Sequence, residues 1–120
     1  MPQPFAISCH CGRFRAEVHA EPDDILECNC STCARTGFLR WLLPLEAVTL
    51  KTESIRLSTY LWRDAHGGYH FCPDCGVAVL RTGWGDRIAV NARCIEGIDV
   101  FTLRSRRYDG RCDMPPGPTR

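Results

Sequence analysis

The sequence predicts a mostly β fold built from antiparallel sheets. Three observations support this prediction: short runs alternate apolar and polar residues, glycine- or proline-containing turns separate these runs, and long helical periodicity is absent. A chain with many short strands and frequent turns buries its apolar faces by packing sheets rather than helices. We therefore expect strands to form most of the core.

The clearest strand is expected over residues 13–19. Phe14, Ala16 and Val18 alternate there with charged and polar residues. Successive side chains of a strand point to opposite faces, so this spacing places one face in a core and the other in water.

Several further runs have the β-branched, aromatic or apolar character of strands. Further strands are predicted at residues 38–43, 55–62, 76–81, 87–91 and within 100–108. The glycine-rich connection 82–86 predicts a hairpin between two of these strands. One short helical turn is expected to begin at Ser31. We expect a single domain over residues 1–113, followed by a flexible tail over 114–120, where three prolines and a glycine disfavour both helix and sheet.

The number of cysteines indicates which classes of protein to consider. The 120 residues include nine cysteines and have a formal net charge of +1. This number of cysteines is typical either of a secreted disulfide scaffold or of an intracellular metal protein. The first residues lack the charged start and apolar run of a signal peptide, and no stretch has the length of a membrane helix. We therefore expect a cytoplasmic protein with reduced cysteines and no membrane partner.

Seven of the nine cysteines fall into three clusters. These are Cys9-His10-Cys11-Gly12, Cys28-Asn29-Cys30-Ser31-Thr32-Cys33 and Cys72-Pro73-Asp74-Cys75-Gly76. The third cluster is a C-x-x-C-G turn, in which glycine permits a left-handed bend that points backbone amides at two metal-bound sulfurs. The alternative is a redox dithiol, but such a motif normally opens a helix, whereas a strand-like run follows here.

Cys72 and Cys75 supply only two of the four ligands that a structural zinc requires. Cys9 and Cys11 are the natural complement, because a glycine again follows the second cysteine. Such a site would be closed, and it would join two parts of the chain about 60 residues apart, which restricts the unfolded chain strongly. The sequence thus predicts a structural zinc on these four cysteines.

The middle cluster offers three cysteines, Cys28, Cys30 and Cys33. Three protein ligands with an open fourth position are typical of a catalytic or ligand-binding zinc. The alternative is a closed structural site with a fourth protein ligand, and the sequence does not decide between these two kinds of site. The residues that would close it are Cys94, Cys112, Asp64 or a histidine, of which His66 and His70 are the ones to inspect.

Two arginines near the middle cluster have two possible roles. Arg35 and Arg40 could offset the negative charge of the thiolates, or they could bind a carboxylate of a substrate. Cys94 is expected to be a buried small apolar residue, which is the usual role of a cysteine without a neighbouring cysteine.

The order C-x-C-G, C-x-C-S-x-C and F-C-x-x-C-G resembles the glutathione-dependent formaldehyde-activating enzyme family, which includes centromere protein V-like members. The likeness covers roughly residues 5–111. It includes residues 91–99 and 108–111, which are similar to the C-terminal stretch of the family. The sequence departs from the family after residues 109–111, where family members often have an aromatic residue and this chain has Cys112. The resemblance implies a β-tent fold of antiparallel sheets with zinc knuckles.

The resemblance also implies two zinc ions per chain. One is the structural zinc on the four cysteines of the first and third clusters, and the second, held by Cys28, Cys30 and Cys33, would lie near bound glutathione. This implication favours the open site over the closed one. The three cysteines of the middle cluster are then the candidate catalytic residues.

The activity implied by the resemblance is that of a carbon–sulfur lyase forming S-hydroxymethylglutathione from formaldehyde and glutathione, or acting on a related thiol adduct. The expected partner is thus a small-molecule thiol or aldehyde adduct. An alternative is a non-catalytic zinc-binding module that binds a thiol or a protein partner. Nucleic acid is not expected as a partner, because the net charge is close to zero and only residues 104–107 form a basic run.

Overall fold

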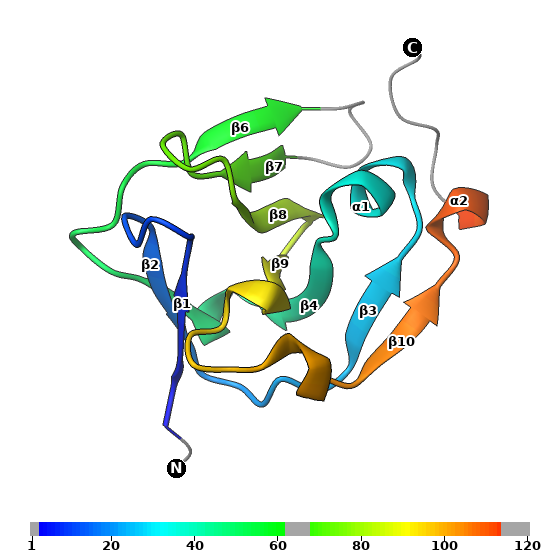
Figure 1. Cartoon of the computed structure of the whole chain (residues 1–120), viewed down its shortest axis with the longest axis horizontal. Coiled ribbons are helices and arrows are strands. Elements are labelled where there is room, and N and C mark those ends of the chain that lie inside the picture. Colours follow the sequence, from blue (N-terminus) through cyan, green and yellow to red (C-terminus); the bar gives the residue numbers. More distant parts are fainter. Residues whose placement is uncertain (1–2, 62–67, 114–120) are drawn as a thin grey trace.

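The computed structural model describes residues 3–61 and 68–113, and within them the strands form two sheets (Figure 1). The smaller sheet has the order β1-β2-β5 and is antiparallel throughout. Its strands are β1 (Phe5–Ser8), β2 (Arg15–Val18) and β5 (Val48–Leu50). The prediction of a mostly β fold built on antiparallel sheets is confirmed.

The larger sheet has the order β10-β3-β4-β9-β8-β7-β6. Its strands are β3 (Ile25–Cys28), β4 (Leu39–Pro44), β6 (Ser58–Leu61), β7 (Gly68–Phe71), β8 (Ala78–Trp84), β9 (Arg87–Asn91) and β10 (Ser105–Tyr108). All its pairs are antiparallel except β10 with β3, which run parallel.

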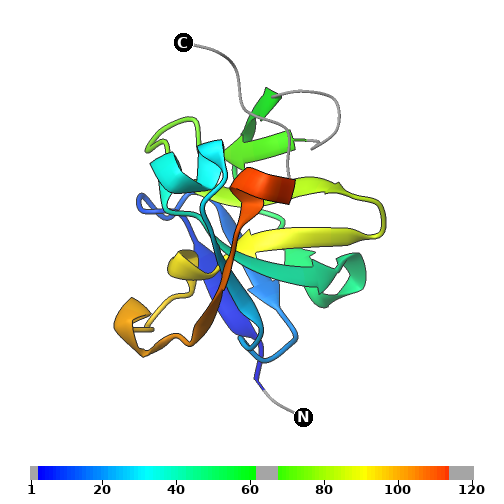
Figure 2. The ribbon, with the colours of Figure 1, turned by 90° about the vertical axis from the view of Figure 1, so that its right-hand side faces the viewer.

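Short helices follow several strands of the larger sheet. They are α1 (Ser31–Thr36), α2 (Gly110–Asp113) and the 3-10 turns η1 (Leu45–Ala47), η3 (Ala92–Cys94) and η4 (Val100–Thr102). Because β10 runs parallel to β3, the helices that follow them, α2 and α1, begin at the same end of the sheet (Figure 2). None of the helices in the described part of the chain has the length and apolar character to cross a bilayer.

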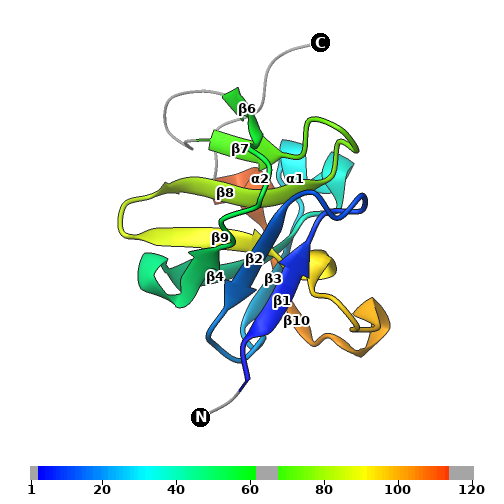
Figure 3. The ribbon, with the colours of Figure 1, turned by 90° about the vertical axis from the view of Figure 1, so that its left-hand side faces the viewer.

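The main core lies between the two sheets, where β1 and β2 cross the larger sheet (Figure 3). The alternation predicted over residues 13–19 is present, since Phe14, Ala16 and Val18 are all buried there. From the larger sheet, Trp41 and Leu43 join the same cluster. The intervening residues of β4 point to the opposite face, because side chains alternate along a strand.

That opposite face holds a second, smaller cluster. Its buried members include Cys28, Cys30 and Cys33, and its partly buried members include Trp84 and Tyr108. The larger sheet therefore separates an apolar core on one face from a cysteine-rich cluster on the other.

One sequence-based boundary needs correction. The connection predicted over residues 82–86 is only the two-residue turn Gly85–Asp86, because β8 continues to Trp84 through a register shift after Arg81. The run 100–108 begins with η4, and its strand starts at Ser105. The helical turn expected at Ser31 is present as α1. The tail over residues 114–120 lies outside the described residues, and the domain boundary at 113 stays a prediction.

Candidate metal centres

The first candidate centre joins two turns that belong to different sheets. Cys9 and Cys11 lie between β1 and β2, whereas Cys72 and Cys75 lie between β7 and β8. Their four sulfurs all lie within 4.8 Å of one another. The sequence prediction that these four residues come together is thus matched by the geometry.

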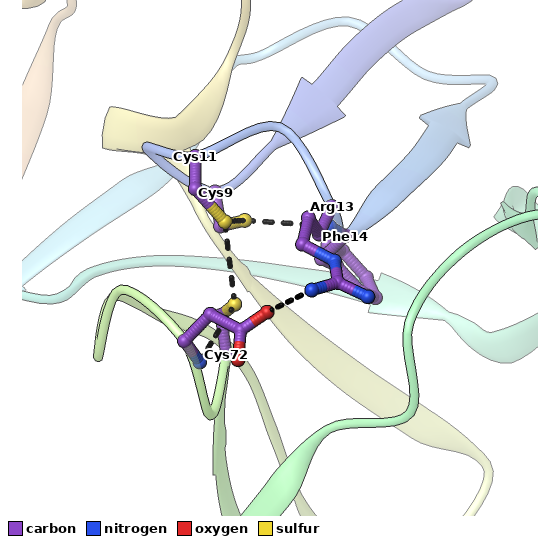
Figure 4. A network of polar contacts seen from close by, with 6 residues as sticks. Cys9, Cys11, Arg13, Phe14 and Cys72 are labelled. Atoms are coloured by element: carbon purple, nitrogen blue, oxygen red, sulfur yellow. Dashed lines mark hydrogen bonds and ion pairs between the residues drawn. The ribbon is translucent and has the colours of Figure 1, made fainter.

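The sulfur spacing fits a shared metal ion. The Sγ atom of Cys11 lies 3.5 Å from that of Cys9 and 3.7 Å from that of Cys72 (Figure 4). A disulfide requires about 2.05 Å. A tetrahedron of thiolates with zinc–sulfur bonds of about 2.3 Å has edges of about 3.8 Å. All eight cysteines whose side chains the structure describes are free thiols, so a disulfide framework is excluded for them.

Backbone amides of both turns point at the sulfurs. The N–H of Phe14 donates to Cys9 Sγ at 3.3 Å, and the N–H of Asp74 donates to Cys72 Sγ at 3.4 Å. Gly12 and Gly76 follow with φ of 82° and 79°. This is the left-handed bend expected from the C-G pairs, and it stabilises negative charge on the sulfurs.

The surroundings of Cys75 favour its thiolate. Burial opposes ionisation, but backbone N–H groups of Cys11 and Val77 and hydrogen bonds from the thiols of Cys9 and Cys72 outweigh it and lower the pKa of Cys75 to about 6. A thiolate at neutral pH is the form that binds metal. The cluster therefore has the chemistry of a metal ligand set.

An ion pair also spans the two turns. Arg13 Nη1 lies 2.6 Å from Asp74 Oδ2, and both side chains are largely solvent-exposed (Figure 4). Exposed pairs of this kind contribute about 0–1 kcal/mol. The sulfur cluster, rather than this pair, is therefore the main candidate for fastening the two sheets together.

Gly76→Ala should weaken both the fold and metal binding at this centre. Nothing lies within 4 Å of the position of an added Cβ, so the cost comes only from the left-handed backbone, about 1 kcal/mol in the free energy of unfolding. Urea denaturation and competition with a chromophoric chelator measure the two effects.

Gly85→Ala is the matched control for this prediction. Gly85 also has a positive φ, 66°, and open space around it, but it lies in the β8–β9 turn. It should lower the free energy of unfolding by a similar amount and leave metal affinity unchanged. Equal metal affinities for the two variants would contradict the role given to the Gly76 turn.

The second candidate centre is built at the end of β3. Cys28 is the last residue of β3, Cys30 precedes α1 and Cys33 lies inside α1. All three are buried, and their sulfurs lie within 4.8 Å of one another. Residues three apart face the same side of a helical turn, which brings Cys33 back to Cys30. Gly37 then ends α1 with a φ of 72°, and its N–H donates to the carbonyl of Cys33.

Hydrogen bonding within this centre favours an ionised sulfur. The pKa of Cys30 is lowered to about 3, first because the Cys33 thiol donates to it, and further by the Cys33 amide and the Thr32 hydroxyl. The pKa of Cys33 is raised correspondingly, chiefly by the same contact. The N–H of Cys30 donates to Cys28 Sγ at 3.3 Å.

Arg81 also contacts this centre, and sequence reasoning missed it. Its Nη1 donates to Cys33 Sγ at 3.2 Å, and the residue is only 1% exposed. The sequence feature that could have indicated a buried arginine is the position of Arg81, directly after the apolar run 77–80 of an expected strand. Arg35, which the sequence suggested, is exposed and donates to the carbonyl of Ser31 within its own helix.

Among the side chains that the structure describes, no fourth cysteine, histidine or carboxylate joins Cys28, Cys30 and Cys33. Cys94 is buried away from them, donates to the carbonyl of Ala78 at 3.7 Å, and has its pKa raised to about 12 by burial. His70 instead contacts the hydroxyls of Thr59 and Thr82, each at 2.9 Å. Asp64, His66 and the side chain of Cys112 lie outside the described residues.

A cleft of about 600 Å³ opens onto the second centre. Its lining includes Cys28, Cys33, Tyr108, Arg93 and Arg107. This volume is typical of small-molecule sites. The Nε of Arg93 donates to the carbonyl of Gly37 at 2.8 Å, and both residues line the cleft. The three cysteines are thus buried but adjacent to a space large enough for a ligand.

Comparisons with known proteins agree with this arrangement. The sequence model of a family described as glutathione-dependent formaldehyde-activating enzyme matches residues 4–101. Among solved structures, a crystal structure of a Rhodobacter sphaeroides protein from a structural genomics programme is similar, with a TM-score of 0.75 and 24% identity. The match covers 85% of this chain and 97% of that one, and it supports the fold alone. No curated protein matches the sequence.

Proposed function

Because this chain belongs to the glutathione-dependent formaldehyde-activating enzyme family, as its cysteine motifs predicted, we propose that it is a zinc-dependent carbon–sulfur lyase-type enzyme acting on glutathione or a related thiol adduct. The observation that supports this proposal most is the second centre. Three buried cysteines meet beside a cleft, and no fourth ligand joins them among the described side chains.

The residues present fit two zinc ions. Cys9, Cys11, Cys72 and Cys75 would hold a structural ion, and Cys28, Cys30 and Cys33 would hold the second with one coordination position open. A zinc ion at the second centre lowers the pKa of a thiol that coordinates it, so that the thiol binds as a thiolate. The chain's own contribution is to hold three buried sulfurs beside the cleft and to exclude water from them.

The proposed reaction is the addition of a thiol to an aldehyde. A sulfur–carbon bond forms, the carbonyl oxygen takes up a proton, and the thiol gives up its proton, so that formaldehyde and glutathione yield S-hydroxymethylglutathione. The protein would act mainly by holding the two reactants in contact, which is the entropic contribution to catalysis.

The cleft has charges suited to a peptide thiol. Glutathione has two carboxylates and one amine, and the cleft is lined by charges of both signs: Arg93 and Arg107, together with Glu27 and Asp109. Arg107 Nε lies 3.7 Å from Glu27, whereas the Arg93 guanidinium is fixed by a backbone carbonyl and keeps its charge for a ligand. We therefore assign Arg93 to carboxylate recognition.

Reduced thiolates of this kind suit a reducing compartment, so we place the protein in the cytoplasm.

Metal analysis combined with a rate measurement tests the proposal. We expect about two zinc ions per chain and faster formation of the glutathione–formaldehyde adduct with protein than without it. Zinc at both centres with glutathione binding but no acceleration would point to a thiol-binding module. The absence of both binding and acceleration, for glutathione and for related thiols, would overturn the proposed function.

A further inference from the structure

Arg40 is a buried cation that forms no ion pair with a carboxylate among the described side chains. It lies in β4 and is 5% exposed. Within the described residues its Nε and Nη2 atoms are buried and have no hydrogen-bond partner, and no carboxylate lies within ion-pair distance of it. An unpaired buried charge strongly destabilises a fold unless its surroundings compensate for it. Its presence therefore requires an explanation.

Aromatic rings enclose the Arg40 guanidinium. Its Cζ lies 5.1 Å from the ring centre of Tyr108 and 5.6 Å from that of Trp84. The Cζ of Arg81 lies 5.6 Å from the same Trp84 ring and 5.8 Å from the ring of Tyr69. Two guanidinium groups thus alternate with three aromatic rings on one face of the larger sheet. Contacts of this kind attract a cation but supply no negative charge.

Strand register places Arg40 beside the second metal centre. Arg40 pairs with Leu26 of β3, and Cys28 lies two residues further along on the same face. Tyr108 pairs with Cys28 and lines the cleft. The Arg40 guanidinium therefore contacts a ring that lines the cleft. Because Arg40 is buried, its charge acts on the cleft through a medium of low polarity, where it is weakly screened.

We propose that Arg40 is a positioning residue that makes this cleft select an anionic ligand over a neutral one. A thiol would bind as its thiolate, with its proton released to solvent, and the positive charge beside Tyr108 would stabilise that anion. The inference rests on the proposed function for the identity of the thiol, but the preference for anions over neutral ligands can be measured without it.

The test uses the purified full chain loaded with cobalt(II), whose absorption spectrum changes when a ligand enters the open centre. Three ligands are titrated at fixed pH and ionic strength: glutathione, thiocyanate as a small anion, and imidazole as a neutral ligand. We expect Arg40→Met to weaken the binding of glutathione and thiocyanate about tenfold or more, and to leave imidazole binding within about threefold of the wild type.

Two further variants separate charge from structure. Arg87→Met removes an exposed arginine at the start of β9 and should leave all three affinities unchanged. Arg40→Lys keeps the charge without the planar stacking, and it should keep the preference for thiocyanate over imidazole within about threefold of the wild type. If Arg40→Met does not fold, the ligand preference of Arg40→Lys alone tests the proposal.

The outcomes distinguish the two proposals. If the wild type binds thiocyanate and imidazole but neither glutathione nor a related thiol, the proposed function fails, while the loss of thiocyanate preference in Arg40→Met would still support the role of Arg40. If Arg40→Met loses thiocyanate and imidazole equally, or if Arg40→Lys loses the preference, the residue is only structural and the inference is overturned. Failure of the wild type to bind any of the three ligands would overturn both.

Discussion

Cys72→Ser should unfold the domain under conditions where the unaltered protein is folded. Cys72 is 0% exposed, and its sulfur lies 3.7 Å from that of Cys11, 61 residues away. Structural zinc sites contribute roughly 10–16 kcal/mol of apparent binding free energy in zinc-finger peptides, as much as the whole stability of a typical domain of about 5–15 kcal/mol. Loss of one of four thiolates therefore removes an amount of stabilisation that the core cannot replace.

The topology explains why this effect should extend to the whole molecule. The smaller sheet contacts the larger one across the main core, and the first centre joins the β1–β2 turn to the β7–β8 turn. Without that connection, the two turns would each lose a fixed partner, and the restriction on the unfolded chain would be lost as well. We expect a chelator to have the same effect on the unaltered protein.

Thermal denaturation followed by circular dichroism, together with zinc analysis, measures the effect of Cys72→Ser. Cys94→Ala is the matched control, because Cys94 is also a buried free cysteine but belongs to neither group of clustered sulfurs. That control should cost only about 1 kcal/mol, the usual effect of a small change in a core. Similar melting temperatures for the two variants would contradict a structural metal at the first centre.

Local sequence signals were sufficient to predict the two turns of the first centre. Gly12 and Gly76 each follow a cysteine, and each adopts the left-handed conformation that such a turn requires. The strict alternation around Phe14, Ala16 and Val18 likewise identified β2 and its buried face. These features depend on neighbouring residues, which is why a sequence alone reveals them.

Features that depend on strand register were not predictable in the same way. Arg81 reaches Cys33 because β8 pairs with β9 and β9 pairs with β4, and no local pattern specifies that order. The parallel pairing of β10 with β3 depends on a connection through most of the chain. Strands as short as β1 and β5 also contain too few residues to show a clear period.

The sequence left charge compensation and carboxylate binding open for Arg35 and Arg40, but in the structure Arg81 contacts the sulfurs and Arg93 lines the cleft. Arg81 donates directly to a cysteine sulfur, Arg40 is buried against the Tyr108 ring, and Arg93 is exposed and lines the cleft. In our proposal, Arg81 compensates the charge of the thiolates and Arg93 recognises a carboxylate. This division supports the view that the second centre is adapted to a ligand as well as to a metal.

Cys30→Ser should abolish activity while leaving the domain folded, the opposite of the effect expected at Cys72. Hydrogen bonds, chiefly from the Cys33 thiol, lower the pKa of Cys30 to about 3, so this sulfur is a thiolate at neutral pH. A serine hydroxyl remains protonated and is a poor zinc ligand, so the second ion should be lost and the first retained. We expect the rate of adduct formation above background to fall at least about 100-fold, the scale of effects when a residue supporting a metal ligand set is removed.

The fold should survive Cys30→Ser because the second centre does not join the two sheets. Its three sulfurs come from β3 and the adjoining α1. Zinc content should fall from about two ions per chain to about one, and the melting temperature should change far less than for Cys72→Ser. Ser31→Ala is the matched control: the Ser31 hydroxyl is buried without a hydrogen-bond partner among the described residues, so its removal should be nearly neutral. A Cys30→Ser variant that kept both its zinc and its rate would show that the middle cysteines do not form the reactive centre, whereas global unfolding would show that both centres are structural.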